Sequence, residues 1–173
     1  MRAAIMAGAM MTAGLASGPA GAETPATPES VVSAFMAEVR SGKAPERASD
    51  YMASTVIAHQ MNAENQTSVE RTPQQYADHV REFLTAYGDF DFVVTEQIAA
   101  GDRVYVRWQQ DGRHVASLDG ENPSGLPLRE IASAVYRVAD GKIAEYWIQI
   151  DRYGFDRQLQ DIKAANGAAG VAQ

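Results

Sequence analysis

Residues 141–159 read GKIAEYWIQIDRYGFDRQL and decide the fold of this chain. An Asp140-Gly141 pair opens the stretch, and such a pair between alternating apolar runs is typical of a two-residue hairpin turn. Residues 128–139 before the turn and residues 142–151 after it alternate in the manner of strands. The stretch therefore predicts a β-hairpin whose second strand runs into a short terminal segment ending in Gln-Leu.

Three helical segments are expected before the main strands. Thr27 followed by Pro28 is typical of a helix start, with a capping residue and a proline in the first turn. Residues 45–52 also begin with proline and predict a second, shorter helix. Residues 72–75, TPQQ, form a capping box with proline at the first helical position, and Gly88 is placed to end the helix that follows.

The apolar period changes from helical to strand-like after the third helix. A short strand is expected earlier, at residues 56–61, and the polar residues 62–71 predict a loop. Helices followed by sequential strands predict a single α+β domain. The remaining strands are expected at residues 90–98, 104–108, 128–139 and 142–151, with a Gly/Pro-rich loop at 119–127.

The first 22 residues are interpreted as a signal peptide. A single charge precedes Glu23, residues 3–16 are small or apolar, and residues 20–22, AGA, fit a cleavage site. We therefore expect a periplasmic or secreted protein with its domain at residues 23–163 and a disordered tail at residues 164–173. A disordered leader behind a mis-assigned start codon is the alternative.

The composition excludes several classes of function. A formal net charge of −7 without basic runs argues against nucleic acid and against an anionic membrane as partners. The chain has no cysteine, which excludes disulfides, thiolate nucleophiles and thiolate metal sites. Its three histidines have no i,i+4 spacing, so we expect no metal and no cofactor. Nucleophile-elbow and phosphate-loop motifs do not occur either.

The run YRVADGKI at residues 136–143, the E-x-W strand after it and the G-x-x-x-Q-L motif at residues 154–159 form one signature. This signature resembles that of the SnoaL-like polyketide cyclases, also called ester cyclases, in the nuclear transport factor 2-like superfamily. The resemblance covers residues 28–159. It implies a cone in which a curved antiparallel sheet wraps around the N-terminal helices and leaves a pocket for a small hydrophobic molecule. It also implies cofactor-free chemistry and a homodimer through the convex sheet face.

The same signature contains a departure from the family pattern. The family keeps a catalytic aspartate in an E-H-W-D run on the last strand, and the matching residues here are Glu145-Tyr146-Trp147-Ile148. A family histidine on the preceding strand would fall near Ala134, which cannot ionise. The family reaction needs a buried carboxylate with a raised pKa. We therefore expect this chain not to use the usual mechanism.

Strand alternation defines the face that we expect to line the pocket. It places Ala134 and Tyr136 on one face, and Tyr146 and Ile148 on the matching face of the next strand. Small alanines would widen a cavity there. Tyr146 could donate a hydrogen bond to a developing oxyanion. An ordinary packed core is the alternative interpretation of these residues.

Two ionisable residues are the candidates for proton transfer. The pKa of a histidine lies near working pH, so His59 would suit a general base. Asp151, at the end of the last strand, could be a relocated base at the pocket mouth. His59 could instead be a hydrogen-bonded structural residue, and Asp151 could cap the terminal turn. Trp108 and His114 share one strand face and are expected to line the pocket, although Trp108 could be plain core.

These observations support two functional hypotheses. The first is an exported, cofactor-free enzyme that acts by acid–base catalysis on a small cyclic or polyketide-like molecule, with isomerase, lyase or cyclase chemistry. The second is a non-catalytic module that has kept the pocket and lost the chemistry. The positions of His59 and Asp151 discriminate between them, because only side chains that share a cavity could act on one ligand.

Overall fold

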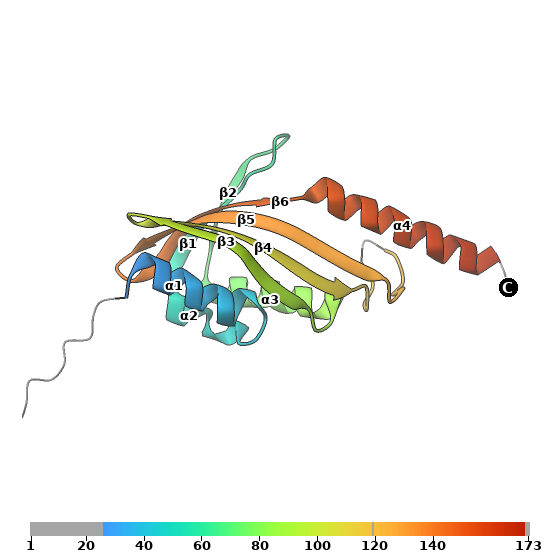
Figure 1. The fold of residues 1–173 in the computed structure, drawn as a ribbon, viewed down its shortest axis with the longest axis horizontal. Coiled ribbons are helices and arrows are strands. Elements are labelled where there is room, and N and C mark those ends of the chain that lie inside the picture. Colours follow the sequence, from blue (N-terminus) through green and yellow to red (C-terminus); the bar gives the residue numbers. More distant parts are fainter. Residues whose placement is uncertain (1–25, 119, 172–173) are drawn as a thin grey trace, which may run out of the picture.

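The computed structural model of the protein describes residues 26–118 and 120–171, and the expected signal peptide lies outside these residues. Within the described ranges, six strands form one sheet in the order β2-β1-β6-β5-β4-β3 (Figure 1). The elements are α1 (Pro28–Phe35), η1 (Met36–Arg40), η2 (Pro45–Arg47), α2 (Ala48–Tyr51), β1 (Met52–Gln60), β2 (Thr67–Arg71), α3 (Pro73–Tyr87), β3 (Asp91–Ala100), β4 (Arg103–Arg113), β5 (Pro127–Ala139), β6 (Lys142–Ile150) and α4 (Arg152–Val171).

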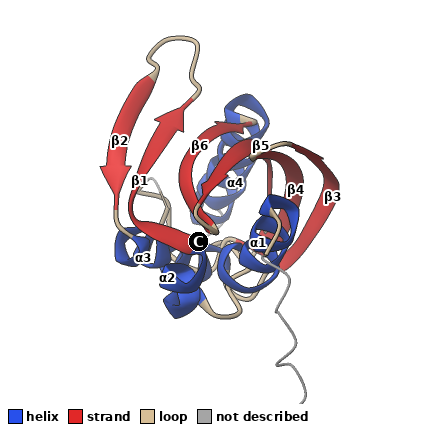
Figure 2. Ribbon diagram, turned by 90° about the vertical axis from the view of Figure 1, so that its left-hand side faces the viewer, coloured by secondary structure: helices blue, strands red, loops and turns tan. Residues whose placement is uncertain are grey.

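The sheet curves around the N-terminal helices, which lie on its concave side (Figure 2). The main core fills the space between them and includes Phe35 and Val80 from the helices and Trp108 and Tyr136 from the strands. All neighbouring strands pair antiparallel except β1 and β6, which are parallel. The α+β class is therefore confirmed, with one parallel pair in a sheet that the sequence predicted to be antiparallel.

Two predicted helix starts are confirmed by their capping hydrogen bonds. Thr27 accepts a hydrogen bond from the Ser30 N–H at 3.1 Å and begins α1. The capping box of α3 is complete, since the Gln75 N–H donates to Thr72 Oγ1 at 3.2 Å and the Thr72 N–H donates to Gln75 Oε1 at 2.9 Å. Gly88 follows α3 with a φ of 66°, a conformation that glycine adopts without strain.

The hairpin turn between β5 and β6 is also confirmed. Asp140 and Gly141 both have positive φ, 50° and 72°, as a two-residue hairpin loop of this type requires. The turn pairs Ala139 with Lys142, and a register shift between Arg137 and Val138 then pairs Tyr136 with Tyr146. Because side chains alternate between the faces of a sheet, this register decides which residues of β5 and β6 reach the concave side.

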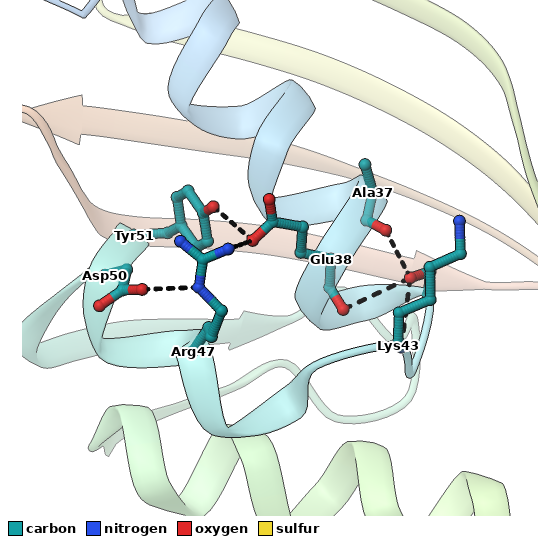
Figure 3. A network of polar contacts seen from close by, with 7 residues as sticks. Ala37, Glu38, Lys43, Arg47, Asp50 and Tyr51 are labelled. Carbon is teal, nitrogen blue, oxygen red and sulfur yellow. Dashed lines mark hydrogen bonds and ion pairs between the residues drawn. The ribbon is translucent and has the colours of Figure 1, made fainter.

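A polar network ties η1 to the short helices that follow it (Figure 3). Arg47 contacts Glu38 and donates from Nε to Asp50 at 2.8 Å, and the Tyr51 hydroxyl donates to Glu38 at 2.6 Å. The hydrogen bond to Glu38 raises the pKa of Tyr51. Pairs as exposed as these contribute at most about 1 kcal/mol each. Their main effect is to hold η1 in place relative to η2 and α2.

The segment that was expected to be a loop contains a strand. Residues 67–71 form β2, an edge strand that pairs with β1, where the sequence predicted a loop over residues 62–71. The strand is exposed on both faces except at Arg71. It therefore lacks the apolar alternation from which strands are predicted, because only a strand with one buried face needs that pattern.

The C-terminal segment is a long helix in place of the short segment and disordered tail that were expected. Helix α4 continues to Val171 and projects past the end of the sheet (Figure 1). Phe155, Leu159 and Ile162 pack against Tyr87 and Leu128 in a second apolar cluster. Alanines after residue 163 favour the continued helix. Within the described chain, no helix is both long and apolar enough to span a membrane.

Candidate functional site

A cavity of about 510 Å³ lies between α3 and the concave face of the sheet. This volume is within the range of about 300–1,000 Å³ that is usual for ligand sites. A groove of about 690 Å³ between α1 and β3 is larger, but its ionisable residues are all exposed. The concave cavity is therefore the better candidate. Its wall includes Arg40, Gln60, Arg71, Tyr76, His79, Val80, Glu82, Phe83, Glu130, Tyr146, Ile148, Arg152 and Asp156.

A buried ion pair reaches the inner wall of this cavity. Arg40 Nη2 donates to Glu130 Oε1 at 2.7 Å, and Arg40 Nη1 donates to Gln110 Oε1 at 2.8 Å. Arg40, Glu130 and Gln110 are 2%, 5% and 0% exposed. Charges at this depth are expensive unless they are paired, so the two side chains depend on each other. Arg40 engages Oε1 of Glu130, and Glu130 forms part of the cavity wall.

Neighbouring elements hold the ion pair in place. Glu130 and Gln110 are register partners on β5 and β4, so their side chains lie next to each other on the concave face. The Arg40 guanidinium lies 4.8 Å from the ring centre of Phe83 and 5.2 Å from that of Trp108. Such rings attract a cation and exclude water from it. The widened helical turn of η1, in which the Ser41 N–H donates to the Met36 carbonyl at 3.1 Å, carries Arg40 to this position.

Three tyrosines lie beside the ion pair. The ring centre of Tyr146 lies 6.0 Å from that of Tyr76 and 5.9 Å from that of Tyr136. Burial, and next the nearby Tyr76, raise the pKa of Tyr146. Burial also raises the pKa of Tyr76 and of Tyr136. All three hydroxyls are therefore neutral near pH 7, and Tyr146 can present a hydrogen-bond donor to the cavity.

Some of the residues that were expected to line the pocket do so, and others are packed in the core. Tyr146 and Ile148 do line the cavity. Ala134, Tyr136 and Trp108 lie on the concave face but are 2%, 1% and 0% exposed and belong to the packed core. These three are therefore core residues, as the alternative interpretation predicted. The physical reason is that the N-terminal helices pack directly against these residues in the middle of the sheet.

His114 is also buried, but outside the cavity wall. It follows the last residue of β4 and is 0% exposed. Its Nδ1 accepts a hydrogen bond from the Ser124 N–H at 3.3 Å and lies 3.2 Å from Ser124 Oγ. His114 therefore fixes the connection between β4 and β5 and does not take the pocket position that its parity with Trp108 predicted.

His59 lies on the opposite face of the sheet from the cavity. The parallel register pairs it with Trp147, on which its ring stacks at 4.9 Å, whereas its neighbour Ala58 pairs with Tyr146 on the concave side. This register places the imidazole on the convex face. The expectation that His59 faces the pocket is thus corrected, and the residue has no route to a ligand in the cavity.

His59 lies between Ser68 and Glu145 in a line of three hydrogen-bonded side chains. Its Nδ1 lies 2.7 Å from Ser68 Oγ and its Nε2 lies 2.8 Å from Glu145 Oε1, while Arg137 Nε donates to the other oxygen of Glu145 at 2.8 Å. The order of groups matches a hydrolytic triad. Ser68, however, is exposed on an edge strand, and Glu145 is held by an arginine. The line fastens β2 to β1 and β6.

Asp151 is exposed and caps the first turn of α4. Its Oδ1 accepts a hydrogen bond from the Gly154 N–H at 2.9 Å. It lines a different, more open hollow together with Ser133 and Gln149. This position corresponds to the structural alternative for Asp151 and not to a base at the pocket mouth. His59 and Asp151 therefore do not meet in one cavity.

Sequence reasoning missed the ionisable residues that do reach the cavity. Glu130 carried a signal, because it shares the inward face of its strand with Ala134 and Tyr136. Arg71 was hidden in the predicted loop. His79 lies at the cavity rim, with its side chain 44% exposed and Nδ1 3.1 Å from Glu82. Among the residues that the structure describes, no cluster of three or more acidic or histidine side chains could hold a metal ion.

Comparisons with known proteins agree with this architecture. A crystal structure of a candidate polyketide cyclase from Acidithiobacillus ferrooxidans matches with a TM-score of 0.68 at 21% identity, over 80% of this chain and 99% of that one. IdmH, a candidate polyketide cyclase from Streptomyces antibioticus, matches with a TM-score of 0.65 at 22% identity, over 78% of this chain and 99% of that one.

A further similar structure is a protein from Catenulispora acidiphila with a ketosteroid isomerase-like fold, which has a TM-score of 0.52 at 15% identity over 72% of this chain and 86% of that one. These likenesses confirm the nuclear transport factor 2-like cone. No curated protein sequence matches the chain. The family model of the SnoaL-like polyketide cyclases matches residues 30–159, and the chain therefore belongs to that family.

Proposed function

We propose that the protein is a cofactor-free enzyme that uses Glu130 as its proton-transfer group on a small cyclic, polyketide-like molecule. The observation that carries the proposal is the buried Arg40–Glu130 pair in the wall of the 510 Å³ cavity. Membership of the cyclase family supports a cyclase-like reaction. Export and assembly into a homodimer remain predictions from the sequence and the family resemblance.

The chemistry needs a base and a group that stabilises negative charge. Glu130 Oε2 would take a proton from a carbon next to a ketone, and the electron pair would move to the carbonyl oxygen to form an enolate. Tyr146 lines the same cavity as a neutral donor and would hydrogen-bond that oxygen. Attack of the enolate carbon on a second carbonyl would close a ring, and protonated Glu130 would return its proton to the resulting alkoxide. Without ring closure, reprotonation of a conjugated enolate at a different carbon would isomerise the ligand.

Exchange of the acidic protons of 2-tetralone in deuterated buffer tests the proton-transfer step. This flat, neutral ketone fits the proposed chemistry, and NMR measures the loss of its α-proton signal. Glu130→Gln should lower the protein-catalysed rate about 10²-fold or more. Asp156→Asn changes a carboxylate at the exposed rim of the same cavity and serves as the matched control. Thermal melts of both variants establish that they are folded at the assay temperature.

The second candidate function is a non-catalytic binding module. The apolar residue Ile148 at the family's acid position favours it. In that case 2-tetralone would shift the NMR signals of cavity residues such as Tyr146, while its proton exchange would stay at the rate of buffer alone. Catalysed exchange that is unchanged in Glu130→Gln would remove Glu130 from the mechanism.

A further inference from the structure

Arg71 is a cation in the cavity wall, and the residues that the structure describes do not neutralise its charge by direct contact. It ends β2, immediately before the capping residue of α3. Register places it opposite Val56, which is fully buried in the core, so the Arg71 side chain lies on the concave side of the sheet. There it forms part of the cavity wall, and it is half-buried.

The three arginines of the cavity differ in their partners. Arg40 pairs with Glu130, and Arg152 pairs with Glu64. Across residues 26–118 and 120–171, the Arg71 guanidinium makes no hydrogen bond to another side chain or to the backbone and no ion pair. A planar guanidinium with five N–H donors matches a carboxylate in a bidentate fashion. Arg71 is therefore the group in the wall that is best placed to receive an anionic ligand.

The surroundings of Arg71 limit the kind of anion. Arg71 lines the same cavity as Tyr76 and Tyr146, where its charge opposes the burial that raises the pKa of both tyrosines. The cavity also contains the carboxylates of Glu82, Glu130 and Asp156, which repel a dianion such as a phosphate monoester. A ligand with one negative charge and an apolar body suits both constraints. The rings and methyl groups of Phe83, Val80 and Ile148 line the apolar part.

We propose that the cavity selects a flat cyclic ligand that carries one carboxylate, and that Arg71 binds this carboxylate. The inference deepens the proposed function and rests on it, because it assigns the substrate class of the same cavity. With its acid group at Arg71, the ring of the ligand would lie along α3. The ketone carbon would then be left to Glu130 and Tyr146, and Arg71 would be a binding residue without a part in proton transfer.

Isothermal titration calorimetry with 2-naphthoate and its neutral methyl ester tests the assignment. The unmodified protein should bind the carboxylate about tenfold or more tightly than the ester, since a charge-assisted bidentate contact is lost with the ester. Arg71→Gln should remove that preference and leave the affinity for the ester unchanged. Arg71→Lys should retain part of the preference, because a point charge replaces the fork.

Arg81→Gln is the control, since Arg81 lies on the exposed side of α3 and pairs with Asp78. Equal affinity for acid and ester, an unchanged preference in Arg71→Gln, or no binding of either probe would refute the carboxylate assignment. The proposed proton transfer is judged separately by neutral 2-tetralone and Glu130→Gln. The two experiments therefore distinguish a failure of the carboxylate assignment from a failure of the proposed proton transfer.

Discussion

Replacing Arg40 by methionine should destabilise the protein more than any exposed ion-pair substitution. The side chains of Arg40 and Glu130 are 3% and 5% exposed, and Nη2 and Oε1 lie 2.7 Å apart. Methionine keeps much of the stem that packs under the rings of Phe83 and Trp108, but it leaves the carboxylate buried without its cation. Removal of one partner of a buried pair costs about 3–5 kcal/mol. For a domain of this size that loss lowers the Tm by about 6–20 °C.

Urea unfolding followed by circular dichroism measures the change, with three further variants for comparison. Arg81→Met removes an exposed pair whose side chains are 42% and 57% exposed, so it should cost less than about 1 kcal/mol. The double variant Arg40→Met, Glu130→Leu replaces both charges by apolar groups and should recover most of the loss. Together with Glu130→Leu it completes a double-mutant cycle.

The outcome separates a buried pair from a solvated one. A loss in Arg40→Met no larger than that in Arg81→Met would contradict the reasoning, because it would mean that water reaches Glu130 when the arginine is absent. A double variant as unstable as the worse single variant would contradict it too. In that case packing of the Arg40 stem, and not charge compensation, would account for the loss.

Two further predictions concern other parts of the fold. Gly112→Ala should lower the free energy of unfolding by about 1–3 kcal/mol in urea, because the added Cβ would lie 2.8 Å from both Cβ and the carbonyl oxygen of Tyr87. Gly120→Ala is the comparison for backbone strain without a steric clash, since open space surrounds that glycine and its φ is 81°. Hydrogen bonds from Arg137 and then His59 lower the pKa of Glu145. Its contribution is therefore complete above the ordinary glutamate pKa of about 4.3 and is lost as pH falls through the lower folded value. The stability difference between the unmodified protein and Glu145→Gln should shrink over that acidic range, and a difference that stays constant with pH would refute the assignment.

The predictable part of the fold rests on local signals. The capping box at Thr72, the proline-led first helix and the Asp140-Gly141 turn each depend on a few neighbouring residues, and the structure contains all three. The turn sets only the first pairs of β5 and β6, and a register shift between Arg137 and Val138 then places Tyr146 and Ile148 on the cavity side. Strand β2 escaped prediction because an exposed edge strand carries no burial pattern.

The unpredicted part of the site depends on long-range pairing. His59 and Ala58 occupy adjacent positions in β1, and only the parallel register with β6 decides which of the two faces the cavity. Arg40 is separated from Glu130 by 90 residues. The residues next to Arg40 in the sequence predict a surface charge there. The same holds for Glu130, although its strand position faces inward. For Asp151 the sequence left two interpretations open, a base at the pocket mouth or a cap of the terminal turn, and the structure shows the cap, on a longer helix than expected.

Under the proposed function, Glu130 would supply the acid in a cavity where Ile148 occupies the expected aspartate position. Ile148 pairs with Ala134, and Glu130 lies two inward positions further along the same strand. The acid thus remains on the concave face but is displaced along β5 towards the part of the cavity beside α3. Glu130 is paired with Arg40, so the cavity wall contains an ion pair and not an isolated carboxylate. A ligand that is held by the cation at Arg71 would present a different atom to this acid than one placed beside residue 148. The two proposals together therefore predict a substrate, and not only a base, that differs from the usual one of the family.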